Sequence, residues 1–181
     1  LTSGQDIPFV IPEYQRPYSW SDDEIITLFE DLWEFSIERT QTEGAKSYFL
    51  GCVVSYEENG ERQIIDGQQR ITSLFLLLRA VFSMLEGDDN QTDEVKNFIA
   101  KIKPALWKEN EMTGKEDRCN ILLRSEVVTD SGNEILRKIL ETGNADPKAK
   151  DNYSKNYNKF LELYKEKAVV SGLQLYHFIL A

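Results

Sequence analysis

The segment IIDGQQRITSLFLLL, from Ile64 to Leu78, decides how this chain is organised. It opens on an apolar pair and closes on a long apolar run with helical spacing, which predicts a strand that turns directly into a helix. The residues DGQQR, Asp66 to Arg70, stand between these two apolar parts. A plain connection needs only a turn and a cap, so these polar and flexible residues exceed what the fold requires. We interpret the segment as a turn that binds a ligand.

The chemistry of this turn suits an anion. Gly67 lets the backbone approach a ligand closely, and the amides at a helix start carry the positive end of the helix dipole. Arg70 would project from the first helical turn and can bind phosphate or carboxylate with a fork of N–H groups. Asp66 can hold a divalent cation, orient a water or bind Arg70. In the structural alternative, Asp66 caps the helix, Gly67 makes the turn and Arg70 pairs with a neighbouring acid.

A second polar and aromatic segment, IPEYQRPYSW, spans Ile11–Trp20. We expect a loop here, because Pro17 removes a backbone donor and biases Arg16 away from helical backbone. Aromatic rings beside an arginine suit stacking on a nucleobase and binding of its phosphates. The alternative places these rings in the core, with Trp20 packing only against its own helix.

The sequence around these segments predicts the other elements of the first half. A helix should begin after Ser21, because Glu24 completes a capping box and Trp20 and Ile25 can form a hydrophobic staple. The other expected elements are a strand at Asp6–Ile11, a strand at Phe49–Tyr56, a type I′ turn at Asn59-Gly60, a return strand at Gln63–Asp66, and a helix to Glu86 ended by Gly87. Together they predict a small unit of mixed α/β structure over residues 1–86.

The second half is expected to be mainly helical, a helical extension over residues 87–181. The expected elements are a helix from Thr92 to Lys103 ended by Pro104, a strand at Cys119–Arg124, a helix at Glu134–Glu141 ended by Gly143, and a last helix whose stripe Tyr153, Tyr157, Phe160 and Tyr164 packs into the core. The chain ends at GLQLYHFILA in an apolar, helix-like pattern without a stop signal, so we expect more protein after Ala181.

Composition narrows the class of protein. The 181 residues carry a net charge of 21 − 31 = −10, so the chain could bind nucleic acid only through a local basic patch or with help from another domain. No apolar run reaches the roughly 18 residues of a membrane span, and we expect no signal peptide, because LTSGQDIPFV has neither a basic region nor an apolar core. Cys52 and Cys119 are far apart and indicate reduced core thiols of a cytoplasmic protein. The single histidine, His177, excludes a histidine-based metal cluster within the chain.

Common nucleotide-binding motifs are missing. The sequence contains neither GxxxxGK(S/T) nor GxGxxG, so a nucleotide would bind here in neither a P-loop nor a Rossmann fold.

The segments IPEYQRPYSW, YFLG and IIDGQQRITSLFLLL, in this order and spacing, closely resemble the N-terminal domain family of GmrSD-type Type IV restriction enzymes. The resemblance covers residues 7 to about 86 and continues more weakly through NILLR and NYSKNYNKF. It implies a ParB/sulfiredoxin-like α+β domain with a small mixed sheet, followed by a mainly helical extension. It also implies a bacterial defence system against phage or modified DNA, in which a domain that binds and hydrolyses a nucleoside triphosphate controls a nuclease domain.

The resemblance also implies roles for individual residues. Catalytic roles fall on Asp66, Gln68 and Gln69, and Asp66 would in addition bind a divalent cation, Mg²⁺. The residues expected at the nucleotide and its phosphates are Gly67, Arg70, Arg16, Gln15, Tyr14, Tyr18 and Thr72. Gly67 to Arg70 also fits the glycine-x-x-arginine phosphate motif of ParB and sulfiredoxin. Gln68 stands where sulfiredoxin requires cysteine, so reductase chemistry is excluded.

Our leading hypothesis is a cytoplasmic nucleoside triphosphatase that controls a defence endonuclease. The expected partners are the nucleotide, a nuclease domain placed C-terminally or in another chain, and DNA through the full assembly, but no membrane. DNA cleavage is not expected from these residues, because the family's histidine-based nuclease is absent from them. One alternative is a DNA-binding module that senses modified DNA without hydrolysis, and another is a purely structural or protein-interaction domain.

Overall fold

The computed structural model describes residues 7–41, 48–88, 91–128 and 131–170. Helices and strands alternate irregularly along these residues. In chain order the elements are β1 (Phe9–Ile11), α1 (Asp22–Gln41), β2 (Val54–Glu58), β3 (Glu61–Asp66), α2 (Gln68–Glu86), α3 (Asp93–Leu106), β4 (Trp107–Glu109), β5 (Glu116–Ile121), β6 (Leu123–Ser125), α4 (Asn133–Thr142) and α5 (Asn152–Val170). This composition confirms the predicted α+β class and its mixed sheet.

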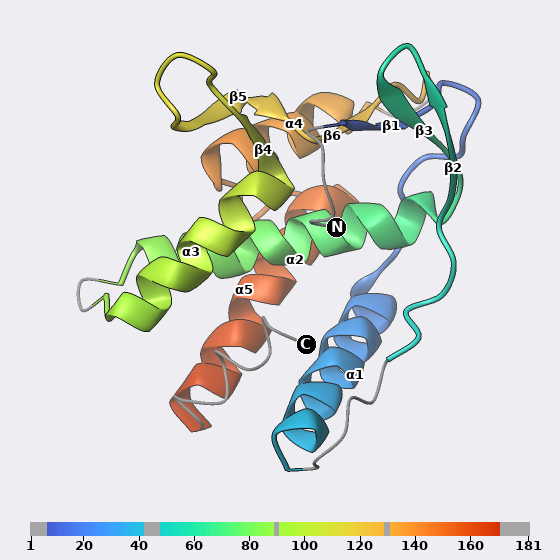
Figure 1. Cartoon of the computed structure of the whole chain (residues 1–181). Coiled ribbons are helices and arrows are strands. Elements are labelled where there is room, and N and C mark those ends of the chain that lie inside the picture. The colour runs from blue at the N-terminus through green and yellow to red at the C-terminus, as the bar shows by residue number, and fades with distance from the viewer. Residues whose placement is uncertain (1–6, 42–47, 89–90, 129–130, 171–181) are drawn as a thin grey trace.

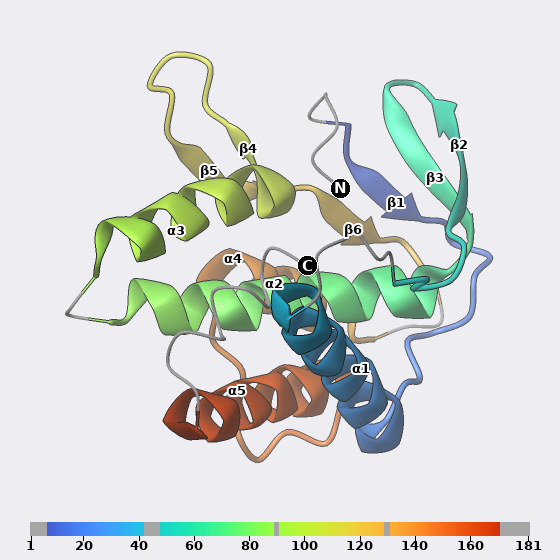
Figure 2. The ribbon, with the colours of Figure 1, turned by 60° about the horizontal axis from the view of Figure 1, so that its bottom comes forward.

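The main sheet has the strand order β2-β3-β1-β6. The central strand β1 runs parallel to both β3 and β6, whereas β2 is antiparallel to β3. Helix α2 runs beneath this sheet, and α1 and α5 lie on the opposite side of α2 (Figures 1 and 2). The strands β4 and β5 form a separate antiparallel pair. Because α2 starts directly after β3, the DGQQR segment lies at the end of the sheet next to its longest helix.

The hairpin that leads to Asp66 forms as predicted. Asn59 and Gly60 both have positive φ, 54° and 76°, which is the backbone of a type I′ turn. This turn pairs Glu58 with Glu61 and brings Val54 opposite Asp66 at the other end of the hairpin. The first strand is shorter than predicted, because Gly51 adopts left-handed backbone with φ 88° and interrupts the extended run.

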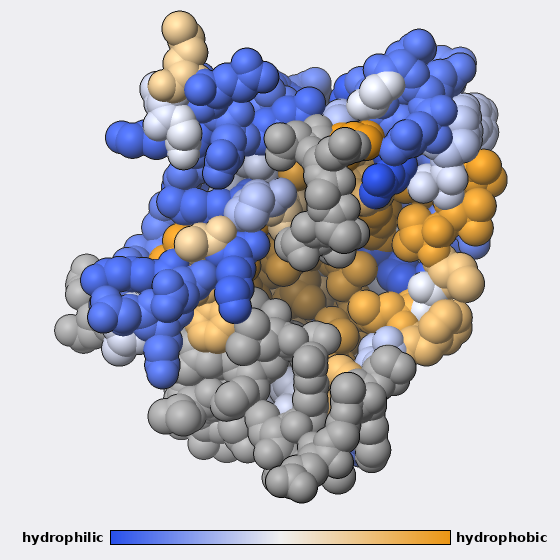
Figure 3. Space-filling model, in the orientation of Figure 1, coloured by the Kyte–Doolittle hydropathy of each residue, from blue (hydrophilic) through white to orange (hydrophobic). Residues whose placement is uncertain are grey.

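Strand β2 forms an edge of the sheet and is exposed along its length. Apolar side chains gather on this side of the molecule, where Figure 3 shows an orange area over β2 and the segment before it. The exposed residues concerned are Phe49, Val53, Val54, Tyr56 and Ile65.

One hydrophobic core connects the two halves of the chain. It includes residues of α1 and α2, and also Trp107, Leu123 and the tyrosine stripe of α5, which is buried as predicted. Strand β6, which follows residue 86, belongs to the main sheet. The proposed division at residue 86 stays a prediction, and it does not coincide with a gap in this core.

Helix starts and stops agree closely with the sequence pattern. Glu24 accepts hydrogen bonds from the Ser21 backbone N–H at 2.8 Å and from the Ser21 hydroxyl at 2.7 Å, so α1 begins at the predicted cap. These hydrogen bonds, the hydroxyl first, lower the pKa of the Glu24 carboxyl. Thr92 caps α3, and Gly143 ends α4 with φ 72°.

Details of the second half differ from the prediction. Helix α3 continues through Pro104, which removes one helical hydrogen bond near its end, and the Trp107 N–H still bonds the Lys103 carbonyl. The expected strand at Cys119–Arg124 is divided at Leu122, and its parts join different sheets.

The interpretation of the cysteines as core thiols is wrong. Cys52 lies exposed in the segment before β2, and Cys119 is exposed on β5, where its thiol donates to the Glu141 carboxylate at 3.2 Å. The apolar residues around Cys52 in the sequence gave a false indication of burial. His177 lies outside the described residues. Among the described helices, none has the length and apolar character that crossing a membrane requires.

Candidate functional site

The two segments that sequence analysis singled out meet at the start of α2. A cavity of about 140 Å³ opens there. It is lined by Arg16 and Trp20 from the first loop and by Asp66, Gly67, Gln68, Gln69 and Arg70. The fold brings them together because β1 lies next to β3 in the sheet, so the loop after β1 and the turn after β3 leave from the same end of parallel strands.

Gly67 forms the turn from β3 into α2. It is the N-cap of α2, with φ 92° and ψ 13°, and no side chain caps the helix. The alternative in which Asp66 is the cap therefore does not describe this structure. A Cβ at Gly67 would lie 3.1 Å from the Cys52 carbonyl oxygen, so the turn requires glycine both for its backbone and for space. The first amides of α2 are consequently left for a ligand or solvent.

Arg70 lies at the edge of this cavity. Its guanidinium donates one hydrogen bond, to the Cys52 carbonyl oxygen at 2.9 Å. It rests directly against Gly51, where an added Cβ would lie 2.6 Å from the guanidinium carbon. No ion pair joins Arg70 to an acid within the described residues, contrary to the structural alternative. Most of its donors therefore remain free for an anion.

Three further side chains of the cavity make no hydrogen bond or ion pair with any residue in the described part of the chain. They are the Arg16 guanidinium, the Asp66 carboxylate and the Gln68 amide. Arg16 and Asp66 are exposed, whereas Gln68 is only 8% exposed. The Gln68 side chain is mostly buried but lines the cavity, so its amide is open to a ligand or water there. These groups are the ones available for binding and chemistry.

Gln69 has a different environment from Gln68. Its side-chain oxygen accepts from the Ser19 N–H at 2.7 Å and the Trp20 N–H at 3.3 Å, and its amide donates to the Pro17 carbonyl at 3.0 Å. Gln69 therefore fastens the first loop to α2. The catalytic role expected for it stays a prediction, and the geometry gives it a positioning role.

Gln15 and Tyr18 also hold the loop in place. The Gln15 amide donates to the Ile64 and Ile65 carbonyls of β3 at 3.2 and 2.9 Å. The Tyr18 hydroxyl is 2.7 Å from the Ser73 hydroxyl and accepts from Asn156 at 2.9 Å. Burial raises the pKa of Tyr18 to about 12, so this phenol stays neutral at ordinary pH.

Two other residues expected at the nucleotide are Tyr14 and Thr72. Tyr14 is 68% exposed and points away from the core, while Thr72 is buried next to Gln68. The roles expected for both residues remain untested.

Two residues that support the site were missed in the sequence. Gly51 provides the space for Arg70, and its place in the apolar run FLGCVV is a signal for close backbone approach that could have identified it. Asn156 donates to both the Tyr18 hydroxyl and the Trp20 carbonyl. It comes from the far end of the chain, and no local pattern indicates this contact.

The whole chain matches a known protein family. Residues 1–180 match the model of the GmrSD restriction endonuclease, N-terminal domain. The chain belongs to this family. No curated protein matches the sequence.

In this GmrSD N-terminal domain, a second cavity of about 330 Å³ adjoins the first and shares Trp20 and Arg70 with it. Its other lining residues come from α1 and from the segment before β2. They are Asp23, Glu24, Thr27, Leu28, Asp31, Tyr48 and Leu50.

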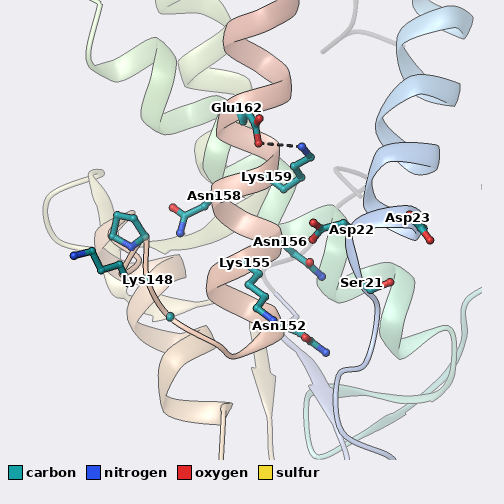
Figure 4. Close-up of a pocket in the computed structure, with 12 residues that line it drawn as sticks. Ser21, Asp22, Asp23, Lys148, Asn152, Lys155, Asn156, Asn158, Lys159 and Glu162 are labelled. Atoms are coloured by element: carbon teal, nitrogen blue, oxygen red, sulfur yellow. Dashed lines mark hydrogen bonds and ion pairs between the residues drawn. The ribbon is translucent and has the colours of Figure 1, made fainter.

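A larger cavity of about 670 Å³ lies between the start of α1 and α5. Figure 4 shows Lys155 and Lys159 on α5 and Lys148 in the preceding loop, with Asp22 and Asp23 across from them on α1. Lys159 is paired with Glu162 at 3.0 Å. The opposite charges around this cavity balance, and it contains none of the DGQQR residues. We therefore assign the functional site to the start of α2.

Proposed function

We propose that the cavity at the start of α2 binds the triphosphate of a nucleoside triphosphate and that this domain hydrolyses it. The observation that carries the proposal is the uncapped N-terminus of α2, with the guanidinium groups of Arg16 and Arg70 on the same cavity. Helix amides and arginine forks are the groups that proteins use for phosphate. They give a local positive site in a chain whose net charge is −10.

The donor set also fits a divalent cation bound together with the phosphates. Mg²⁺ is usually held by one or two carboxylates, waters and phosphate oxygens rather than by a cage of protein ligands. Asp66 is the acid among the described residues that line this cavity, and its carboxylate has no partner there. No cluster of His, Cys, Asp or Glu in the described part of the chain would hold a metal without the nucleotide. The cation would neutralise charge on the phosphate oxygens.

In the proposed hydrolysis, a water oxygen bonds to the γ-phosphorus. The bond from phosphorus to the bridging oxygen breaks, and the nucleoside diphosphate leaves with the electron pair. Asp66 accepts the proton of the attacking water, and the Gln68 amide orients that water. Arg16 and Arg70 bind the phosphate oxygens, where negative charge changes most.

Binding is tested first with the 181-residue chain, Mg²⁺ and β,γ-imido triphosphates, which are not cleaved. We expect Arg70→Ala to weaken binding by about one to two orders of magnitude, because a charge-assisted hydrogen bond contributes about 1.5–3 kcal/mol. Arg137→Ala on the surface of α4 is the matched control and should bind normally. Titration calorimetry measures both. No binding of any nucleotide by the unchanged chain would reject the proposal.

Asp66→Asn separates binding from hydrolysis. The change removes a negative charge next to the phosphates, so binding without metal should hold or improve. Turnover should fall at least about a hundredfold, since a general base contributes about that much. Phosphate release measures turnover under saturating nucleotide. A variant with full turnover would show that Asp66 has no part in the chemistry.

We also propose that nucleotide turnover in this domain controls a nuclease domain, as the family description indicates a restriction endonuclease. That nuclease would follow in the same protein or sit in a partner chain, and the assembly would act on foreign DNA. Reconstitution of the chain with its nuclease tests this link. DNA cleavage should depend on nucleotide and should be lost with Arg70→Ala.

A further inference from the structure

We propose that the cavity next to the phosphate site holds the nucleoside and selects guanine. The proposal rests on the proposed binding of a nucleoside triphosphate at the start of α2. It assigns the residues that distinguish one nucleotide from another, which the phosphate contacts cannot do.

The sizes of the two cavities support this division. A volume of about 140 Å³ is small for a whole nucleotide, since ligand pockets usually measure about 300–1,000 Å³. The adjoining cavity measures about 330 Å³ and continues directly from the first past Trp20 and Arg70. With phosphates held by Arg70 at the junction, the rest of the molecule can extend only into this second space or into solvent.

The walls of the second cavity suit a planar base. They are mainly apolar, and Trp20, Leu28, Leu50 and Tyr48 provide the rings and aliphatic groups. Aromatic side chains bind nucleobases by stacking, and stacking alone does not distinguish one base from another. These walls therefore explain affinity for a base but not a choice among bases.

Besides Arg70, Tyr48 and Glu24, the polar residues that line the cavity lie on one face of α1. Asp23, Thr27 and Asp31 follow at intervals of four residues, which places them one above the other on the helix. The Thr27 hydroxyl is already used, because it donates to the Asp23 carbonyl at 2.8 Å. The face thus presents carboxylates to whatever occupies the cavity.

Asp31 is the carboxylate whose orientation is fixed. One of its oxygens accepts from the Tyr48 hydroxyl at 2.6 Å, and this hydrogen bond raises the pKa of Tyr48. The Tyr48 ring packs on Phe35, with ring centres 5.7 Å apart. Asp31 is therefore held by a supported side chain, and each of its two oxygens still has a lone pair that can accept from a ligand.

A carboxylate only accepts hydrogen bonds, so it favours a base edge that offers adjacent donors. Guanine presents an N1–H beside its amino group and can bind both carboxylate oxygens. Adenine and cytosine place an acceptor nitrogen next to their amino group, which a carboxylate repels. Uracil flanks its single N–H with carbonyl oxygens. The carboxylate face of α1 therefore selects guanine.

The test measures the affinity of the 181-residue chain, with Mg²⁺, for inorganic tripolyphosphate and for the imido analogues of GTP, ATP, CTP and UTP. We expect the GTP analogue to bind at least about tenfold more tightly than the ATP analogue, which is the lower range for a paired base contact. Asp31→Asn should remove this preference and leave the affinity for tripolyphosphate unchanged. Glu34→Gln, the same loss of charge elsewhere on α1, should change none of these affinities.

The outcomes distinguish failure of this inference from failure of the proposed function. If tripolyphosphate and the analogues bind but guanine is not preferred, the guanine site is rejected and the phosphate site stands. The same holds if Asp31→Asn lowers all affinities equally. If neither tripolyphosphate nor any nucleotide binds, the proposed function fails and this inference fails with it.

Discussion

Two arginines of helix α2, nine positions apart, show how differently one helix uses the same side chain. Arg79 lies in the middle of α2 and is 1% exposed. It donates to the Leu140 carbonyl at 3.0 Å and to the Ser83 hydroxyl at 2.6 Å. Arg70, in the first turn, donates to the Cys52 carbonyl alone among the residues that the structure describes, and it lines two cavities.

Each arginine also lies against a glycine in left-handed backbone. Gly143, with φ 72°, faces the Arg79 guanidinium, and Gly51, with φ 88°, faces that of Arg70. A left-handed glycine packed against the guanidinium therefore accompanies a structural arginine in one place and a proposed ligand-binding arginine in the other. What differs is the number of donors left without a partner, and function is expected where donors remain.

The largest expected effect concerns Arg79. Its guanidinium stacks on Phe82 and Trp107, 5.3 Å from each ring centre, and burial lowers its pKa. Arg79→Ala would remove these contacts and leave a cavity, so we expect a loss of about 3 kcal/mol in the free energy of unfolding. Arg70→Ala should cost less, about 1 kcal/mol, because this half-buried side chain loses one hydrogen bond to the protein. Urea denaturation measures both, and equal losses would contradict the comparison.

Much of the fold around α2 could be predicted from the sequence. The Asn-Gly turn, the caps at Ser21 and Thr92 and the stop at Gly143 are local features, so local patterns identify them. The start of β2 at Val54, after the left-handed Gly51, and the split at Leu122 were not predicted. The split depends on contact between distant segments, the pairing of β6 with β1.

The candidate site was only partly accessible to sequence reasoning. DGQQR and the loop before α1 were identified because they carry more polar groups than their turns need. The sequence could not distinguish Gln68 from Gln69, although the Gln69 side chain is hydrogen-bonded to the loop at Pro17 to Trp20 through both its oxygen and its nitrogen. Neighbouring residues on a helix face different directions, and only the packing of the loop decides which one stays free.

A smaller effect is expected from the glycine beside Arg79. A Cβ at Gly143 would lie 2.6 Å from the guanidinium carbon and 2.7 Å from the Ser83 hydroxyl, in a buried network that includes the Tyr157 hydroxyl. Gly143→Ala should lower the free energy of unfolding by about 2 kcal/mol, from backbone strain and displacement of Arg79. Gly60→Ala, with φ 76° and nothing within 4 Å of its Cβ, controls for strain alone.

Thermal or urea unfolding of the two glycine variants decides this prediction. Gly143→Ala should be clearly less stable than Gly60→Ala, and neither should bind the β,γ-imido triphosphates more weakly. If the two variants unfold alike, Arg79 can move at no cost and is not the fixed structural arginine of the comparison.

The smallest expected effect concerns Gly51 and sharpens the comparison most, because it should appear in binding rather than in stability. The three atoms nearest to an added Cβ there all belong to the guanidinium of Arg70, the far end of a flexible side chain that can move aside at little cost. Gly51→Ala should therefore lose about as much stability as Gly60→Ala, roughly 1 kcal/mol for left-handed backbone. Its affinity for the triphosphate analogues should fall about tenfold, since Arg70 no longer lies where the phosphates bind.

A double variant shows whether Gly51 acts through Arg70. If it does, Gly51→Ala combined with Arg70→Ala should bind no more weakly than Arg70→Ala alone, because residues that act through one contact are not additive. Additive losses would mean that Gly51 serves the site by another route, such as the course of the backbone to the Cys52 carbonyl. An unchanged affinity in Gly51→Ala would show that Arg70 binds its ligand from a position other than the one against Gly51. In that case the resemblance between the two arginine–glycine pairs would be structural only, and the free donors of Arg70 alone would account for its function.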